Sequence, residues 1–289
     1  MPFGSRHLRP VMLLNEVIYV AVAPLLVAAL AAFALRWART PPTIAWATGV
    51  ALGYIAGQFA LASRAGVGHA FSSLINPHEA SDWLPLAVLL ALGVTLLATY
   101  TPRSWRKGTI ALGTLLSIAV PARLLAGHIA QQWSVLEKFS HLVLLSATLG
   151  LVWLLLASIR DERQPRLRQV LLVLVATGAA IVATQSGSFT YGRHCGVVAA
   201  ALTGVAIVSP RGVSGAAGVV TFTLGSLVLL SCFYAELSPM NAALVFISLI
   251  AAAGRLPEIV LMGPPWRQAA LRTALSLVPL ALAIGNSLA

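Results

Sequence analysis

The sequence has 289 residues, of which 58% are apolar and only 9% are charged, and its formal net charge at pH 7 is +11. An ordinary soluble domain has roughly 25% charged residues, and no soluble core hides so much apolar surface. The composition therefore excludes that class and predicts a chain whose solvent is lipid, so that the basic residues indicate membrane orientation rather than binding to nucleic acid.

Ten apolar runs follow one another along the chain, and each is predicted to form a helix that crosses roughly 30 Å of hydrocarbon. Their approximate ranges are 11–35, 43–62, 82–100, 109–129, 134–159, 170–186, 191–208, 213–236, 238–254 and 268–286. We therefore expect an all-α polytopic integral membrane protein with nine to ten transmembrane helices, forming a single domain over residues 1–289. The charged segment 160–168 is the best candidate for a junction between two halves, 1–159 and 169–289.

Small residues recur at strict four-residue spacing in two of these runs. The first stripe contains Gly49, Gly53 and Gly57, and the second contains Gly192, Gly196, Ala200 and Gly204. Four residues are slightly more than one helical turn, so each stripe lies along one helix face and lets another helix approach closely. We expect both helices to be closely packed, with the partner of the first stripe either inside the chain or in another molecule.

The longest polar connection, residues 63–82, contains the pattern of a helix start. Asn76 fits an N-cap, Pro77 fits the first helical position and Glu79 fits the third. We expect a short interfacial helix to begin there. Ser81 or Asp82 is then the expected cap of the third membrane helix.

Ionisable residues occur within the fourth and fifth runs. Arg123 follows a proline in an apolar context, and a guanidinium at membrane depth needs a carboxylate, carbonyl oxygens or water. Glu137 and His141 are four residues apart and share one face of the fifth helix. Glu137 is therefore a candidate partner of Arg123, of Lys138 or of a metal ion.

Arg193, His194 and Cys195 stand in consecutive positions near the start of the seventh run. The glycine stripe in this run favours an inward position for Arg193 and His194. The preceding Ser-Gly-Ser at 186–188 fits an ordinary tight hairpin, which we favour, or a helix end that opens toward an ion. Cys195 and Cys232 are predicted to be two buried free thiols rather than a disulfide.

Basic residues are distributed unevenly between the two sides of the predicted bundle. The odd-numbered loops and the adjacent helix ends contain Arg36, Arg39, Arg103, Arg106, Lys107, Arg160, Arg163, Arg166, Arg168, Arg211, Arg255, Arg267 and Arg272. The positive-inside rule then places both termini on the non-cytoplasmic side. The segment 160–168 becomes a cytoplasmic loop that enforces orientation, which we prefer to a receptor for lipid headgroups.

The remaining polar residues favour the passage of a small solute or ion as the function. The candidates for its polar lining are Arg123, Glu137, His141, Arg193, His194 and Glu236. The alternative is a noncatalytic subunit or scaffold of a larger membrane complex, in which the glycine stripes would be docking surfaces. A second alternative is a membrane-embedded enzyme or a metal- or haem-binding protein.

Chemical motifs are sparse in this chain. The weak candidates for metal ligands are His128, His141, His194 and Glu137, because imidazole and carboxylate suit several metals. No catalytic residue is assigned, since adjacent helical residues such as His194 and Cys195 point about 100° apart. No phosphate-binding loop occurs, and no cofactor is expected. The expected partners are the lipid bilayer and other membrane subunits.

Overall fold

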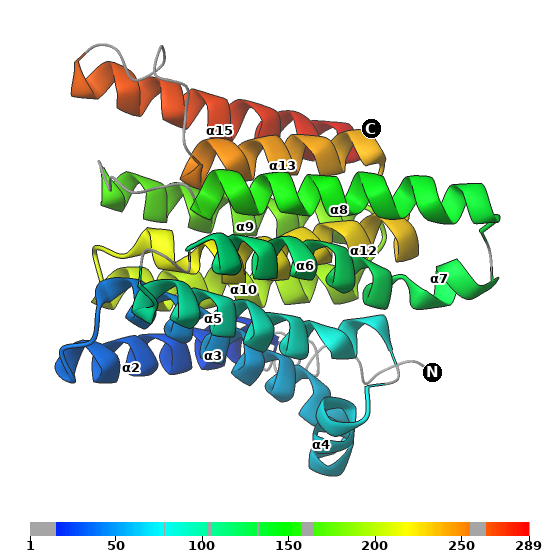
Figure 1. The fold of residues 1–289 in the computed structure, drawn as a ribbon, viewed down its shortest axis with the longest axis horizontal. Helices are drawn as coiled ribbons and strands as arrows, with labels where there is room; N and C mark the ends of the chain where they lie inside the picture. The colour runs from blue at the N-terminus through cyan, green and yellow to red at the C-terminus, as the bar shows by residue number, and fades with distance from the viewer. Residues whose placement is uncertain are drawn as a thin grey trace, which may run out of the picture.

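The computed structural model describes residues 16–77, 79–102, 106–131, 133–157, 164–254 and 264–288 of the chain. These residues form helices joined by short connections, and no strand occurs among them. The predicted all-α polytopic class is confirmed. Figure 1 shows the longer helices side by side along one axis, so that their ends gather at two opposite ends of a bundle.

The longer helices carry the labels of Figure 1. In chain order they are α2 (Ala23–Trp37), α3 (Pro42–Ala62), α5 (Leu84–Tyr100), α6 (Arg106–Leu124), α8 (Val135–Ala157), α9 (Pro165–Gln185), α10 (Phe189–Val208), α13 (Pro239–Ala253) and α15 (Pro265–Leu288). Shorter helical segments are η1 (Ile18–Val22), η2 (Ser63–Ala65), α4 (Val67–Ile75), η3 (Ala80–Trp83), α7 (Ala126–Gln131), η5 (Val213–Ala216), α11 (Ala217–Val220), η6 (Thr221–Gly225) and α12 (Ser226–Tyr234).

Within the described residues, eight helical segments are long and apolar enough to cross a membrane. They are Ile18–Trp37, Pro42–Ala62, Ala80–Tyr100, Val135–Leu156, Pro165–Gln185, Phe189–Val208, Val213–Tyr234 and Pro265–Leu288. The predicted number of nine to ten was therefore too high. The helix α13 has 15 residues and is about 22 Å long, which is shorter than the hydrocarbon layer. The helix α6 carries Arg106, Lys107 and Arg123, which reduce its apolar character.

Two helix boundaries differ from the predicted ones, and a proline explains one of them. Pro165 occupies the first turn of α9, where the missing N–H costs nothing, so this helix starts five residues before the predicted residue 170. Arg166 and Arg168 therefore belong to a helix instead of a loop. The predicted fourth helix is also divided at Leu125, after which α7 begins, although the Leu125 N–H still donates to the carbonyl oxygen of Pro121 at 3.0 Å.

The helical segment that leads into α5 has a different N-cap residue from the predicted one. Asn76 ends the short helix α4 instead of starting a helix. Glu79 is the N-cap of η3, and it forms a reciprocal capping box with Asp82, whose Oδ2 accepts from the backbone N–H of Glu79 at 3.1 Å. The N-cap is therefore Glu79 instead of the predicted Asn76, Ser81 or Asp82, and Asp82 takes part in the cap from the third position.

The glycine stripes lie where α3, α2 and α10 pack closely together. A Cβ atom added to the first stripe would meet α10 at four-residue steps: 2.6 Å from Val205 at Gly49, 2.9 Å from Ala201 at Gly53 and 2.4 Å from Val197 at Gly57. At Gly204 of the second stripe, the added atom would lie 2.2 Å from the carbonyl oxygen of Leu25 in α2. Side chains at these positions would force the helices apart.

The Ser-Gly-Ser segment forms a tight hairpin between α9 and α10. Gly187 has φ +91°, a conformation that residues with a Cβ rarely adopt. The Ser188 side chain then accepts a hydrogen bond from the backbone N–H of Tyr191 and caps α10. The helices α9 and α10 consequently pack against each other along their length.

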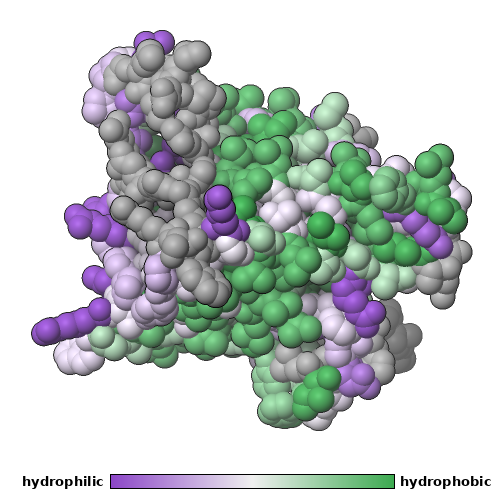
Figure 2. Space-filling model, viewed as in Figure 1, coloured by the Kyte–Doolittle hydropathy of each residue, from purple (hydrophilic) through white to green (hydrophobic). Residues whose placement is uncertain are grey.

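Charge divides the two ends of the bundle. All the carboxylates among the described residues lie at one end, which we call the carboxylate end: Glu16, Glu79, Asp82, Glu137 and Glu236. The opposite end, which we call the basic end, contains Arg36, Arg39, Arg106, Lys107, Arg166, Arg168, Arg211, Arg267 and Arg272. Figure 2 shows apolar side chains over the middle of the visible face. This surface fits a lipid bilayer around the bundle.

Candidate functional site

A polar cavity opens at the carboxylate end, where the break between α6 and α7 faces η3, α10 and α12. Its volume is about 420 Å³. The residues that line it are Pro77, Glu79, Ala80, Ser81, Trp83, Arg123, Leu124, Ala126, Gly127, Tyr191 and Tyr234. Segments far apart in the sequence thus contribute a cation, a carboxylate and two phenol groups to one space.

Arg123 is the cationic group of this cavity, and an aromatic ring holds it in place. The guanidinium carbon lies 3.9 Å from the centroid of the Trp83 ring, which is a favourable cation–π distance. No carboxylate within the described part of the chain forms an ion pair with Arg123. Its hydrogen-bond donors are therefore available to a negatively charged ligand.

Tyr234 forms a hydrogen bond to the end of α6 inside the cavity. Its hydroxyl donates to the carbonyl oxygen of Leu124 at 3.2 Å. Leu124 is the last residue of α6, and its carbonyl group would otherwise lack an intrahelical partner. Tyr191 enters the same cavity from the first turn of α10, so its hydroxyl adds a second group that can donate a hydrogen bond to a ligand.

An apolar groove adjoins the polar cavity. It has a volume of about 210 Å³ and runs between α5 and α6, where Leu86, Leu90, Leu116 and Val120 line it. Trp83, Arg123 and Leu124 line both spaces. A molecule with a polar head at Arg123 and an apolar part in this groove would match the chemistry of both.

Glu137 and His141 do not join Arg123. Glu137 is exposed and caps α8: its Oε2 accepts hydrogen bonds from the backbone N–H and the hydroxyl of Ser134, both at 2.8 Å. His141 lies in an aromatic cluster, with ring centroids 4.7 Å from Trp133 and 5.9 Å from Phe233. The expected pairing of Glu137 with Arg123 or a metal ion is therefore replaced by a capping box.

Arg193 forms a second charged cluster, with Glu16 and Arg64. One carboxylate oxygen of Glu16 lies 2.5 Å from Nη2 of Arg193 and 2.6 Å from Nη1 of Arg64. The Arg193 guanidinium also lies 4.1 Å from the centroid of the Phe189 ring. Arg193 is thus paired with a carboxylate that it shares with Arg64, whereas Arg123 is the cation of the cavity.

The other predicted site residues are separated from the cavity lining. His194 is buried in the protein, and its Nδ1 has no hydrogen-bond partner among the described residues. Glu236 is exposed in the turn between α12 and α13, with φ +57°. The sulfur atoms of Cys195 and Cys232 are not bonded to each other. The structure thus gathers only Arg123 of the six predicted residues into this cavity.

A metal centre is not assembled by the parts of the chain that the structure describes. No group of three or more His, Cys, Asp and Glu residues lies together among them. Of the weak candidates, Glu137 caps a helix, His141 packs against aromatic rings and His194 is buried. The side chain of His128 lies outside the described residues.

Three residues of the cavity were not predicted as its lining. Glu79 was assigned to a helix start, and Tyr191 and Tyr234 fitted the usual position of aromatic residues at a membrane interface. The feature of the sequence that could have identified them is their position, since all three lie at helix ends on one side of the predicted bundle. No protein-family model, curated protein or solved structure matches this chain, so the function of the cavity is argued from its own residues.

Proposed function

We propose that the chain is a membrane transport protein that binds a small organic anion in the Arg123 cavity. The single observation that carries the proposal is the Arg123 guanidinium, held over Trp83 in a cavity of about 420 Å³ without a carboxylate partner among the described residues. Arg123 is exposed in this cavity, and a guanidinium without a carboxylate partner favours a negatively charged ligand. A transported anion supplies that partner.

The surrounding groups favour an anion with an apolar part. Tyr191 lines the same cavity as Arg123, and a phenol hydroxyl donates a hydrogen bond to carboxylate, phosphate or sulfonate oxygens. The Tyr234 hydroxyl already donates to the carbonyl oxygen of Leu124. The groove between α5 and α6 continues from Trp83 and is lined by leucine and valine. Because Arg123 occupies the face of Trp83, an organic cation could not stack on that ring and would meet a like charge beside it. The carboxylate of Glu79, which also lines the cavity, already takes part in the capping box with Asp82.

Passage through the bundle is supported by the most buried span, Val213–Tyr234, which ends in the cavity at Tyr234. Its middle contains the π-helical segment η6, a local irregularity that occurs often at functional sites. The hydroxyl groups of Thr221 and Ser226 are buried and lack hydrogen-bond partners within the described residues. Unsatisfied hydroxyl groups are costly in an apolar environment, so these two are suited to contact water or solute along a route.

A binding experiment tests the proposal with simple amphiphilic anions. Octanoate, hexyl phosphate and hexanesulfonate would be titrated against the purified protein, with acetate as a probe that lacks an apolar part. Loss of hydrogen bonds to a charged group should weaken the best ligand about tenfold to a hundredfold in Arg123→Gln. Lys138→Gln is the matched control, since it removes a cation at the same end but outside the cavity.

Transport is then measured with the labelled ligand in proteoliposomes. We expect Arg123→Gln to abolish uptake, and the double variant Thr221→Val and Ser226→Ala to slow uptake while binding in the cavity is retained. A wild-type protein that binds none of the three anions, or an Arg123→Gln variant that binds as tightly as the wild type, would refute the proposal. Co-purification of a stoichiometric partner with such a protein would favour the scaffold function instead.

The orientation of the bundle is part of this proposal. We place the basic end in the cytoplasm and both termini on the non-cytoplasmic side, because cytoplasmic loops are enriched in Lys and Arg. The Arg123 cavity then opens away from the cytoplasm. A C-terminal fusion in a bacterial host should give active alkaline phosphatase and non-fluorescent green fluorescent protein, and the opposite pair of results would reverse the direction.

A further inference from the structure

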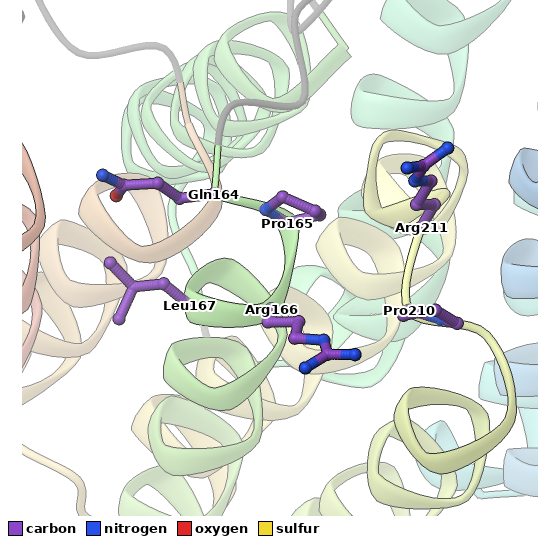
Figure 3. A pocket seen from close by; sticks show the side chains of 6 residues that line it. All are labelled: Gln164, Pro165, Arg166, Leu167, Pro210 and Arg211. Atoms are coloured by element: carbon purple, nitrogen blue, oxygen red, sulfur yellow. The ribbon is translucent and has the colours of Figure 1, made fainter. Parts of the chain in front are cut away.

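A second cavity lies at the basic end, far from Arg123, where α9 begins and α10 has just ended. Its volume is about 440 Å³, and it is lined by Gln164, Pro165, Arg166, Leu167, Pro210 and Arg211. Figure 3 shows the Arg166 side chain extending from the first turn of α9 toward the segment that contains Pro210 and Arg211. Two arginine residues therefore border one opening, and Figure 3 shows their guanidinium groups pointing in different directions.

An apolar groove continues from this cavity along the outside of the bundle. It has a volume of about 480 Å³ and shares Arg166 and Pro210 with the cavity. Its apolar part lies between α9 and α10, and its exposed members include Val170, Leu174 and Ile207. Apolar side chains on the surface of a membrane-spanning helix face lipid chains, so the groove is accessible from the bilayer.

The charge at this end is not balanced by the described residues. Neither Arg166 nor Arg211 forms an ion pair with them, and all the described carboxylates lie at the opposite end of the bundle. The neighbouring cation Arg272 is buried and donates to backbone carbonyl groups. Arg166 and Arg211 are the exposed cations of the cavity, and arginine suits phosphate because its planar group donates two parallel hydrogen bonds.

We propose that this cavity and groove together bind one anionic phospholipid. Arg166 and Arg211 hold its phosphate group, and one acyl chain lies in the groove between α9 and α10. A free phosphate ion would use the two arginines but leave the groove unexplained. A neutral lipid would fill the groove but would bring no net negative charge to Arg166 and Arg211. The proposal concerns a separate site and does not depend on the function assigned to the Arg123 cavity.

The test compares lipid binding by the full-length protein and three variants. The protein is reconstituted with phosphatidylglycerol or phosphatidylcholine, and retained lipid is counted by native mass spectrometry. The double variant Arg166→Gln and Arg211→Gln removes the phosphate contacts. Arg36→Gln with Arg39→Gln is the matched control, since both residues are exposed at the same end and outside the cavity. Ala206→Trp fills the groove without changing the charge.

We expect the wild type to retain one phosphatidylglycerol, with weaker retention of phosphatidylcholine. The Arg166/Arg211 variant should bind phosphatidylglycerol at least about tenfold more weakly, whereas the Arg36/Arg39 variant should bind it as the wild type does. Ala206→Trp should also lose the lipid. All these side chains are at least partly exposed, and the unfolding temperature of each variant verifies that it is folded.

Three outcomes would overturn the proposal. Equal losses in both double arginine variants would indicate general attraction between a basic surface and an anionic membrane. Full retention of phosphatidylglycerol by the Arg166/Arg211 variant would show that these two arginines do not hold its phosphate group. Retention by Ala206→Trp, together with displacement of the lipid by inorganic phosphate, would indicate a site for a free anion instead of a lipid.

Discussion

The two ends of the bundle differ in the groups that contact their arginine side chains. At the carboxylate end, Arg64 and Arg193 share one oxygen of Glu16, and Arg123 lies over the ring of Trp83. Each of these cations is thus held in a defined position by an acidic or aromatic side chain from another part of the chain. Such an end can keep one cation, Arg123, available to a ligand while the other two are held by the carboxylate that they share.

At the basic end, no carboxylate lies among the described residues. The buried cation Arg272 is satisfied by carbonyl oxygens of α13, and the exposed Arg166 and Arg211 border an open cavity. Backbone dipoles stabilise a cation but do not cancel its charge. The difference teaches that cations at one end are held by acidic or aromatic side chains, whereas no carboxylate among the described residues pairs with a cation at the other end.

The largest expected effect comes from Arg272, which tests the basic end. Its Nη1 donates to the carbonyl oxygens of Ala251, Ala252 and Gly254 at 3.0 to 3.2 Å. These groups lie at the end of α13, where helix carbonyls lack intrahelical partners. Replacing Arg272 by Ala should lower the free energy of unfolding by about 3 kcal/mol, because buried acceptors lose a charged donor.

Thermal and denaturant unfolding of the reconstituted protein measure this effect. Arg267→Ala is the control, since Arg267 is exposed on the same helix near the same end, and it should change stability little. Arg272→Lys should fall between them, because it keeps the charge but not the guanidinium geometry. Equal stability of Arg272→Ala and Arg267→Ala would show that the bonds to α13 do not stabilise the basic end.

A smaller effect is expected at Glu16, which tests the internal balance of the carboxylate end. Replacing Glu16 by Gln removes the negative partner of Arg64 and Arg193. The side chains in this cluster are 24% to 29% exposed, so solvent screens part of the loss. We expect the free energy of unfolding to fall by about 1 to 2 kcal/mol, between the values for exposed and buried pairs.

The double variant of Glu16→Gln with Arg193→Met separates this pair from its surroundings. If the two side chains stabilise each other, the double variant should be more stable than the sum of the two single effects predicts. Glu236→Gln serves as a control for losing an exposed carboxylate at the same end. Strict additivity of Glu16→Gln and Arg193→Met would argue against a balanced cluster.

Local patterns in the sequence predicted the helices but not all of their boundaries. Long apolar runs and four-residue glycine spacing depend on the chain within a few turns, and they located α3 and α10 within two residues. The number of spans was overestimated, because α13 is too short and α6 too charged. Proline moved the start of α9, an effect that Pro165 could have indicated.

The cavity was harder to predict because its residues meet only through tertiary packing. Arg123 was recognisable as a charge in an apolar run. Its neighbours Tyr191 and Tyr234 come from α10 and α12, and no local pattern says that these helix ends meet at the break after α6. Glu137 was assigned to the lining although Ser134 three residues earlier forms the capping-box pattern with it.

The smallest expected effect tests this assignment of Glu137. Ser134→Ala and Glu137→Ala each remove part of the capping box of α8. Each should lower the unfolding temperature by less than Glu16→Gln does, because the capping box is exposed to solvent. Because the two side chains form a hydrogen bond with each other, the double variant should unfold at nearly the same temperature as the less stable single variant. Binding of octanoate should be unchanged in all three variants. If Glu137→Ala weakened octanoate binding as Arg123→Gln does, Glu137 would belong to the ligand site, and the cavity would hold a second carboxylate in addition to Glu79.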